Sequence, residues 1–266
     1  MKPIGIFDSG IGGLTVARAV AKSFPEHSIV YFGDTAHLPY GEKSAALIQR
    51  YSSRITSELL ELGCGAIVVA CNSASSNALH QVKELAGDEV PVIDVVTPAV
   101  EKVSNILKPG SQVGVIGTRA TISSNWYQQL LHERGFNAHA KATPLLASAI
   151  EEGFHNGQVS SALIEAYLGQ GEFEECNALI LGCTHYPLIA EQIRAFLPDH
   201  VMLIDSAKAV AESLMHELGS ESLNGEDEMK PPNLQFLVSD LTQSFALGAE
   251  RFFGAPVQLL ERKLQV

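Results

Sequence analysis

The chain has 266 residues, 46% of them hydrophobic and 18% charged, and its formal net charge is −12 at pH 7. This size and apolar content exclude a disordered chain and are enough for one large or two smaller α/β domains. The acidic balance argues against nucleic acid or an anionic membrane as the main partner. No apolar run approaches the roughly 18 residues of a spanning helix. With no signal peptide and four cysteines, we expect a cytoplasmic protein.

Short runs rich in Val and Ile alternate with amphipathic helical patterns, which is typical of βαβ units around a parallel sheet. The expected strands cover residues 3–7, 28–32, 66–70, 92–95, 112–116, 137–142, 178–182, 201–204, 235–238 and 257–261. The expected helices cover residues 13–23, 43–62, 74–86, 98–107, 124–134, 159–169, 188–196, 207–218 and 241–253. The acidic stretch 219–233 holds two glycines and two prolines and predicts a mobile surface loop.

Two segments of the first half recur in the second half at nearly the same offset. PIGIFDSG matches QVGVIGTR at an offset of 109 residues, and the strand before Cys71 matches the strand before Cys183 at an offset of 112. Two matches in the same order indicate a duplicated α/β unit. We therefore expect two pseudo-symmetric, doubly wound domains with mainly parallel sheets. The first domain would comprise residues 1–95 and 208–266, and the second 96–207.

Ligands of open parallel sheets bind beyond the carboxyl ends of the strands. Asp8, Cys71, Gly117 and Cys183 all fall at such ends. If the two halves face each other, these strand ends line one cleft, and we expect the active site there. The glycine-rich turn after Asp8 lacks the third glycine of a dinucleotide fingerprint, because Thr15 stands in that place.

The four cysteines occur as two pairs, and each pair brackets a strand. At ~3.3 Å per residue, the Cα atoms of Cys64 and Cys71 would lie about 23 Å apart. This separation excludes a disulfide or a shared metal ion within a pair. The histidines are scattered without a ligand spacing, so no metal site is expected. We expect Cys64 and Cys176, at the strand starts, only to pack, and Cys71 and Cys183, at the strand ends, to be functional.

An ordered set of motifs runs along the chain: DSGxGG (8–13), YFGDTAHLPYGEK (31–43), VVACNSAS (68–75), GVIGTRAT (114–121), EEG (151–153), LGCTHYP (181–187) and DS (205–206). This set resembles the bacterial glutamate racemase family. Ser73 departs from the threonine usual after Cys-Asn but keeps a hydroxyl.

The resemblance implies a cofactor-independent isomerase that interconverts L- and D-glutamate and supplies D-glutamate for peptidoglycan. It implies that two cysteines act from opposite faces of the substrate α-carbon. Cys71 would deprotonate D-glutamate, and Cys183 would deprotonate L-glutamate. We interpret His185 as the group that tunes Cys183, with Asp8 in the matching role for Cys71.

The resemblance also implies the substrate-binding set and the partners. The expected substrate-binding residues are Asp8, Ser9, Tyr40, Gly41, Asn72, Ser73, Thr184 and His185. Glu151, Thr118 and Thr121 are candidates for supporting roles near the site. The partners implied are glutamate and either a second copy of the chain, as a homodimer, or, for a monomer, a regulating cell-wall precursor.

Other functions stay open from the residues alone. The substrate could be another acidic amino acid such as aspartate. A pyridoxal-phosphate racemase would need a Schiff-base lysine, and Lys208 stands in no recognisable context for one. A cysteine hydrolase using Cys183 and His185 would leave Cys71 without a role. A two-lobed binding protein without catalysis is the alternative from another class.

Overall fold

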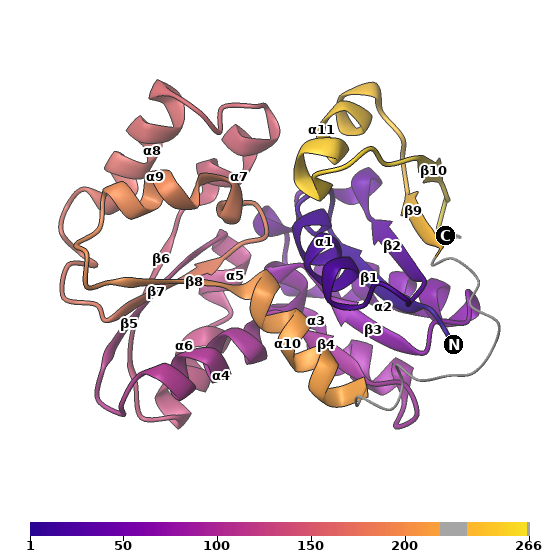
Figure 1. Ribbon diagram of the computed structural model, residues 1–266, viewed down its shortest axis with the longest axis horizontal. Coiled ribbons are helices and arrows are strands. Elements are labelled where there is room, and N and C mark those ends of the chain that lie inside the picture. Colours follow the sequence, from indigo (N-terminus) through magenta and orange to yellow (C-terminus); the bar gives the residue numbers. More distant parts are fainter. Residues whose placement is uncertain (219–232, 265–266) are drawn as a thin grey trace.

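The computed structural model describes residues 1–218 and 233–264, which form two lobes that each contain a parallel β-sheet (Figure 1). The sheet of the first lobe has the strand order β10-β9-β2-β1-β3-β4, and that of the second has the order β6-β5-β7-β8. All neighbouring strands within both sheets are parallel. The two-lobed α/β fold expected from the alternating pattern is confirmed.

The first lobe is built from two stretches of chain that lie far apart in the sequence. Its main elements are β1 (Ile4–Asp8), α1 (Leu14–Ser23), β2 (Ile29–Gly33), α2 (Ala45–Glu61), β3 (Ala66–Val69), α3 (Asn72–Ala86), β4 (Val92–Asp94), β9 (Leu234–Val238), α11 (Gln243–Phe253) and β10 (Leu259–Glu261). Strand β9 pairs with β2, so the end of the described chain returns to the first lobe, as the sequence predicts. The short 3-10 turns Thr35–His37 and Tyr40–Glu42 connect β2 to α2.

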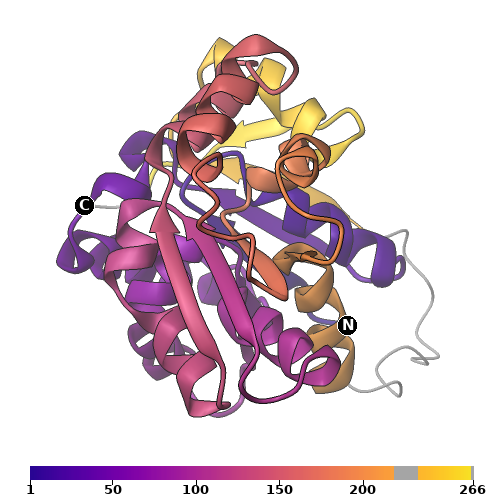
Figure 2. The ribbon, with the colours of Figure 1, turned by 90° about the vertical axis from the view of Figure 1, so that its left-hand side faces the viewer.

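The second lobe comprises the middle of the chain, with helices on both faces of its sheet (Figure 2). Its elements, with the helices that lead into and out of it, are α4 (Val96–Ile106), β5 (Gln112–Gly117), α5 (Arg119–Ser123), α6 (Trp126–Glu133), β6 (Asn137–Ala142), α7 (Pro144–Glu151), α8 (Gln158–Leu168), β7 (Ala178–Gly182), a 3-10 turn (Tyr186–Ile189), α9 (Ala190–Ala195), β8 (Met202–Asp205) and α10 (Ser206–Leu218).

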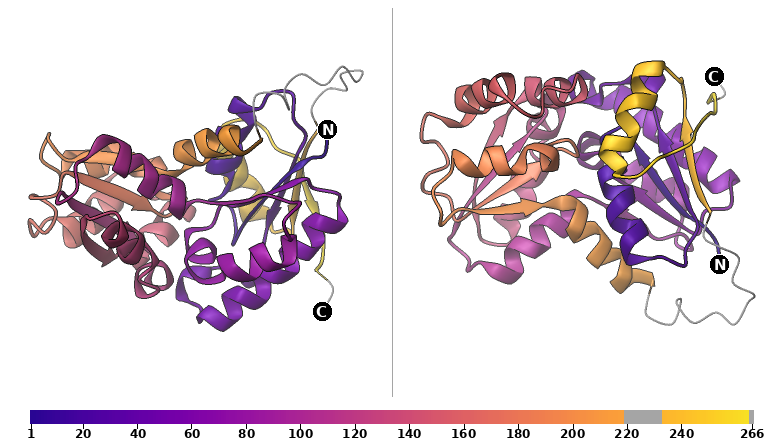
Figure 3. Two further views of the ribbon diagram at one scale, coloured as in Figure 1. Left: turned by 90° about the horizontal axis from the view of Figure 1, so that it is seen from below. Right: turned by 45° about the horizontal axis from the view of Figure 1, so that its top comes forward.

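The order β2-β1-β3-β4 of the first lobe repeats as β6-β5-β7-β8 in the second. The repeat places β1 and β5, and likewise β3 and β7, at equivalent positions, which accounts for the offsets between the sequence motifs. Helices α4 and α10 pack against each other, and α10 also contacts α1 of the first lobe. Figure 3 shows α10 between the lobes. The domain boundaries 1–95 with 208–266, and 96–207, stay a prediction.

Every residue of β1, β2, β3 and β7 is buried. Strands covered on both faces need near-continuous apolar sequence, and these four are rich in Val, Ile and Leu. The same burial carries one carboxylate into the interior, because Asp8 at the end of β1 has no exposed surface.

Three helical segments differ from the sequence prediction. Helices α5 and α7 were not expected, since each is short, and α7 begins at Pro144 after an edge strand. The helix expected at 188–196 is instead the 3-10 turn Tyr186–Ile189 followed by the six-residue α9. The predicted loop 219–233 lies, except for its last residue, outside the described residues. Among the described helices, none has both the length and the apolar character needed to span a bilayer.

Candidate active site

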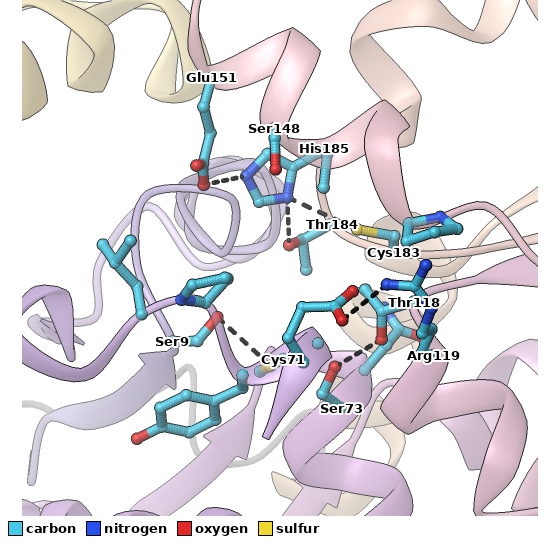
Figure 4. A pocket seen from close by; sticks show the side chains of 18 of the residues that line it. Ser9, Cys71, Ser73, Thr118, Arg119, Ser148, Glu151, Cys183, Thr184 and His185 are labelled. Atoms are coloured by element: carbon cyan, nitrogen blue, oxygen red, sulfur yellow. Dashed lines mark hydrogen bonds and ion pairs between the residues drawn. The ribbon is translucent and has the colours of Figure 1, made fainter. Parts of the chain in front are cut away.

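A cavity of about 200 Å³ lies where the carboxyl ends of the two sheets meet (Figure 4). The residues predicted from the sequence that line it are Asp8, Ser9, Tyr40, Gly41, Cys71, Asn72, Ser73, Thr118, Glu151, Cys183, Thr184 and His185. Thr121 does not line the cavity, but its hydroxyl lies 3.0 Å from that of Thr118 and 3.4 Å from that of Ser73. The structure therefore gathers residues that are up to 177 positions apart, from Asp8 to His185, around one space.

Cys71 enters the cavity from the first lobe. It is the N-cap of α3, and its Sγ lies 3.7 Å from Oγ of Ser9. Burial and the nearby Asp8 carboxylate raise the pKa of the Cys71 thiol to about 12, although hydrogen bonds from Ala74 and Ser9 act in the opposite direction. This environment therefore favours the thiol form of Cys71 at neutral pH.

Cys183 enters from the second lobe, after β7, and has a basic partner that Cys71 lacks. Nδ1 of His185 lies 3.5 Å from Cys183 Sγ, and Nε2 of the same ring lies 2.7 Å from Oε1 of Glu151. Burial alone would lower the pKa of His185, but the Cys183 thiolate and the Glu151 carboxylate together raise that pKa well above its ordinary value. Hydrogen bonding to His185 lowers the pKa of Glu151 against the opposing effect of its burial. These shifts favour the imidazolium form of His185 beside the ionised Glu151 carboxylate.

Two buried polar atoms of the cavity wall have no hydrogen-bond partner within the described residues. Oδ2 of Asp8 accepts from the backbone N–H of Gly10 at 3.1 Å, but Oδ1 has no donor. Oδ1 of Asn72 accepts from the hydroxyl of Tyr127 at 2.8 Å, but its Nδ2 has no acceptor. Leaving such groups unpaired costs about 1–3 kcal/mol each, so they mark places where a ligand would bind. One is an acceptor and the other a donor.

Tight contacts between the lobes shape the cavity. A Cβ on Gly12 would lie 2.5 Å from Cε1 of His185, and one on Gly41 would lie 2.7 Å from Cβ of Thr118. Only glycine permits these approaches. The hydroxyl of Ser73 lies 2.9 Å from that of Thr118 across the same boundary.

Asp34 supports the wall that carries Tyr40 and Gly41. This carboxylate is fully buried and accepts from the hydroxyl of Tyr40. It also accepts from the hydroxyl of Ser239 at 2.8 Å, while Nδ1 of His37 lies 2.8 Å away. The three contacts fix the loop after β2 against the returning β9 segment.

Sequence reasoning did not identify several residues of the site or its support, among them Asp34, Arg119, Ser148 and Tyr127. Asp34 lies within the YFGDTAHLPYGEK motif, which was the available signal. Arg119 follows Thr118 directly at a strand end; it lines the cavity and forms an exposed 2.7 Å ion pair with Glu42 across its mouth. Ser148 lies on the unexpected α7, and Tyr127 reaches Asn72 only through the tertiary fold.

Metal-binding groups offer no second interpretation of the site. Across residues 1–218 and 233–264, no cluster of three or more His, Cys, Asp or Glu side chains is arranged to hold an ion. All four cysteines, Cys64, Cys71, Cys176 and Cys183, are free and buried.

The two-lobed α/β fold is that of a family of amino-acid racemases. The Asp/Glu/Hydantoin racemase family model matches residues 14–214, and the chain belongs to this family.

Glutamate racemases are among the relatives most similar to this chain. The glutamate racemase of Aquifex pyrophilus is 44% identical over 239 residues, which cover 88% of this chain and 92% of that protein. The crystal structure of glutamate racemase from Francisella tularensis subsp. tularensis SCHU S4 in complex with D-glutamate has a TM-score of 0.90 and 37% identity. The match covers 99% of this chain and 97% of that one.

A more distant structure includes a regulator. The Escherichia coli glutamate racemase in complex with L-glutamate and the activator UDP-MurNAc-ala has a TM-score of 0.77 and 25% identity, with full coverage of both chains.

Proposed function

We propose that the protein interconverts L- and D-glutamate by proton transfer at Cα, with Cys71 and Cys183 as the two acid/base groups. The observation that carries this proposal is the placement of the two thiols. They follow the equivalent strands β3 and β7, belong to different lobes, and line one cavity. Inversion at a carbon requires one proton-transfer group on each face, and a duplicated fold supplies two such groups.

The unpaired atoms of the wall match the polar ends of an amino acid. Oδ1 of Asp8 would accept from the substrate ammonium, and Nδ2 of Asn72 would donate to a carboxylate. Ser9, Ser73, Thr184 and the loop with Tyr40 and Gly41 would complete the substrate site with further hydrogen-bonding groups. Neutral donors suit a carboxylate in this site because a bulky cation would compete for the neighbouring thiolate.

The proton transfers balance in both directions. With L-glutamate, the Cys183 thiolate takes the α-proton, the Cα–H bond breaks, and its electron pair is delocalised into the α-carboxylate. The Cys71 thiol then gives its proton to the opposite face of Cα and becomes a thiolate. With D-glutamate, Cys71 removes the proton and Cys183 returns one. The raised pKa of Cys71 favours its thiol, which is the form that donates a proton when L-glutamate reacts.

His185 and Glu151 belong to the Cys183 half of this scheme. An imidazolium 3.5 Å from the sulfur stabilises the thiolate through a charge-assisted hydrogen bond. Glu151 fixes the ring by accepting from its other nitrogen. Asp8 is the corresponding charged group beside Cys71, where its negative charge favours the thiol.

The chemistry as proposed uses only side chains of this chain, so we expect activity without added pyridoxal phosphate, metal or nucleotide. D-Glutamate formed in this way would serve peptidoglycan synthesis. Four free thiols fit a reducing, cytoplasmic setting. Homodimer formation, or control of a monomer by a cell-wall precursor, stays a prediction.

The proposal is tested by incubating the protein with L-glutamate in D₂O and following circular dichroism and the α-proton signal together. We expect loss of optical activity at the same time as deuterium enters Cα, and no comparable change with L-aspartate. Faster racemisation of L-aspartate than of L-glutamate would show that aspartate, and not glutamate, is the substrate. Stable optical activity with both amino acids would favour the non-catalytic binding protein.

A further inference from the structure

Two cavities meet at the ion pair between Arg119 and Glu42. The active-site cavity of about 200 Å³ and a neighbouring cavity of about 450 Å³ share three wall residues, which are Gly41, Glu42 and Arg119. We call the larger cavity the vestibule. Ser44 and Ser123 in its wall are exposed, so it is open to solvent. A molecule that moves from the vestibule to the two thiols therefore passes the ion pair.

The pair joins the two lobes at the mouth of the active-site cavity (Figure 4). Arg119 begins α5 of the second lobe, and its Nη1 donates at 2.7 Å to Oε2 of Glu42, which ends a 3-10 turn of the first lobe. The two side chains are 61% and 46% exposed. Exposed ion pairs contribute little to stability, so this contact can break and form again while α3 and α5 stay joined through the 3.1 Å hydrogen bond from Asn77 to the carbonyl of Ala120.

Arg119 is the one arginine or lysine among the described residues that line the active-site cavity, whereas Asp8, Glu42 and Glu151 are acidic. Glutamate carries two carboxylates and one ammonium, so it arrives as a net anion. An acidic wall disfavours the entry of an anion unless a cation at the mouth compensates for it. Arg119 is the cation in that position.

The guanidinium of Arg119 can accept a second partner before it releases the first. It has five N–H donors. Within the described part of the chain, its one hydrogen bond runs from Nη1 to Glu42. An incoming carboxylate can therefore bind the remaining N–H groups while Glu42 is still in place, and the exchange does not require a free guanidinium.

We propose that the Arg119–Glu42 pair is the entry gate of the active-site cavity, and that Arg119 binds the side-chain carboxylate of the incoming amino acid in exchange for Glu42. The side-chain carboxylate is the better partner, because the α-carboxylate stands beside an ammonium that Arg119 repels. The ammonium end then enters first, towards the unpaired Oδ1 of Asp8. Renewed pairing with Glu42 closes the mouth and keeps the guanidinium away from the thiols. The gate itself is independent of the proposed function, whereas the binding of glutamate by Arg119 rests on it.

The first test measures access to the cavity without substrate. Iodoacetamide, a neutral reagent, is added to the full chain, and alkylation of Cys71 and Cys183 is followed by mass spectrometry of their peptides. Glu42→Gln and Arg119→Gln each break the pair, and both should speed alkylation by roughly two- to fivefold, the range that an exposed ion pair can supply. Loss of a carboxylate and loss of a guanidinium shift the pKa of a nearby thiol in opposite directions, so a gain in both variants reports access.

The second test separates the binding of substrate by Arg119 from the opening of the gate. Arg119→Gln should lower kcat/KM for L-glutamate by roughly three- to tenfold, because it removes the cation that receives the carboxylate. Arg119→Lys should restore at least half of the loss. Glu42→Gln should raise kcat/KM by about the factor by which it speeds alkylation, because a larger fraction of the molecules is open.

The matched control is Glu58→Gln. It breaks a 2.7 Å ion pair with Arg262, and neither of these side chains lines the active-site cavity or the vestibule. Alkylation of the two cavity thiols and kcat/KM should both stay at the values of the parent.

Alkylation at the parent rate in both gate variants, faster alkylation in only one of them, or an equal gain in Glu58→Gln would overturn the gate. A fall of kcat/KM in both Glu42→Gln and Arg119→Gln would overturn the binding of substrate by Arg119. If both gate variants speed alkylation but the parent does not racemise glutamate, the gate stands. The proposed function, and with it the binding of glutamate by Arg119, would then be refuted.

Discussion

Replacing His185 by glutamine tests the electrostatic asymmetry between the two thiols. The change keeps a hydrogen-bonding group of similar size but removes the charge 3.5 Å from Cys183 Sγ. Only 8% of the His185 side chain is exposed, so water would replace little of the lost interaction. Hydrogen bonds to charged groups contribute about 1.5–3 kcal/mol, which corresponds to a fall in kcat/KM of roughly 10- to 150-fold.

The equilibrium constant of racemisation fixes how the loss of kcat/KM divides between the L-to-D and D-to-L directions. Enantiomers have equal free energy, so kcat/KM must fall by the same factor for L- and D-glutamate. The step that His185 assists is nevertheless proton transfer to and from Cys183. The primary isotope effect on kcat/KM should therefore rise with α-deuterated L-glutamate and fall with α-deuterated D-glutamate.

The assay compares initial rates of racemisation by circular dichroism with protiated and deuterated substrates. His27→Gln is the matched control, because His27 is also buried but does not line the cavity. It should leave both isotope effects unchanged even if it lowers stability. A kcat/KM within about threefold of the parent, or isotope effects that move together in both directions, would refute the role given to His185.

Three further predictions concern the substrate site and Cys71. Asp8→Asn removes the anionic acceptor for the ammonium, and glutamate binding measured calorimetrically should weaken roughly 10- to 150-fold; unchanged affinity would contradict the assignment. Tyr127→Phe leaves the buried Oδ1 of Asn72 without its donor. KM should rise about 2- to 10-fold and the free energy of unfolding should fall by about 1–3 kcal/mol, as checked by steady-state kinetics and chemical denaturation. In Cys183→Ala, the pKa of about 12 for Cys71 keeps the thiol protonated. Its alkylation rate with iodoacetamide should then rise about tenfold per pH unit between roughly pH 7 and 10. A plateau within this pH range would show that the thiolate of Cys71 is more stable than its burial beside Asp8 implies.

The sequence was most informative where local pattern and chemistry coincide. Strands that are buried on both faces can be recognised in the sequence as Val- and Ile-rich runs. The residue after such a run falls at the edge of the sheet where ligands bind. Cys71 and Cys183 could therefore be placed at one cleft from the repeat alone. Their immediate neighbours along the chain, Asn72, Thr184 and His185, followed from the same positions.

The support of the site was less accessible to sequence reasoning. Tyr127 lies 55 residues from Asn72, and no local pattern links a helix residue to an amide on another lobe. The position of Glu151 depends on α7, an eight-residue helix with an apolar sequence and no clear amphipathic period. Asp34 was visible in a motif, but its role as the acceptor for three side chains depends on Ser239, which lies 205 residues away.

The central claim is that each thiol acts on one face of the α-carbon, and single-cysteine variants test it most directly. In D₂O, Cys71→Ala should exchange the α-proton of L-glutamate through Cys183 without inversion and should leave D-glutamate unlabelled. Cys183→Ala should label D-glutamate and not L-glutamate. Near-normal racemisation by either variant, or exchange with the opposite stereochemistry, would contradict the account.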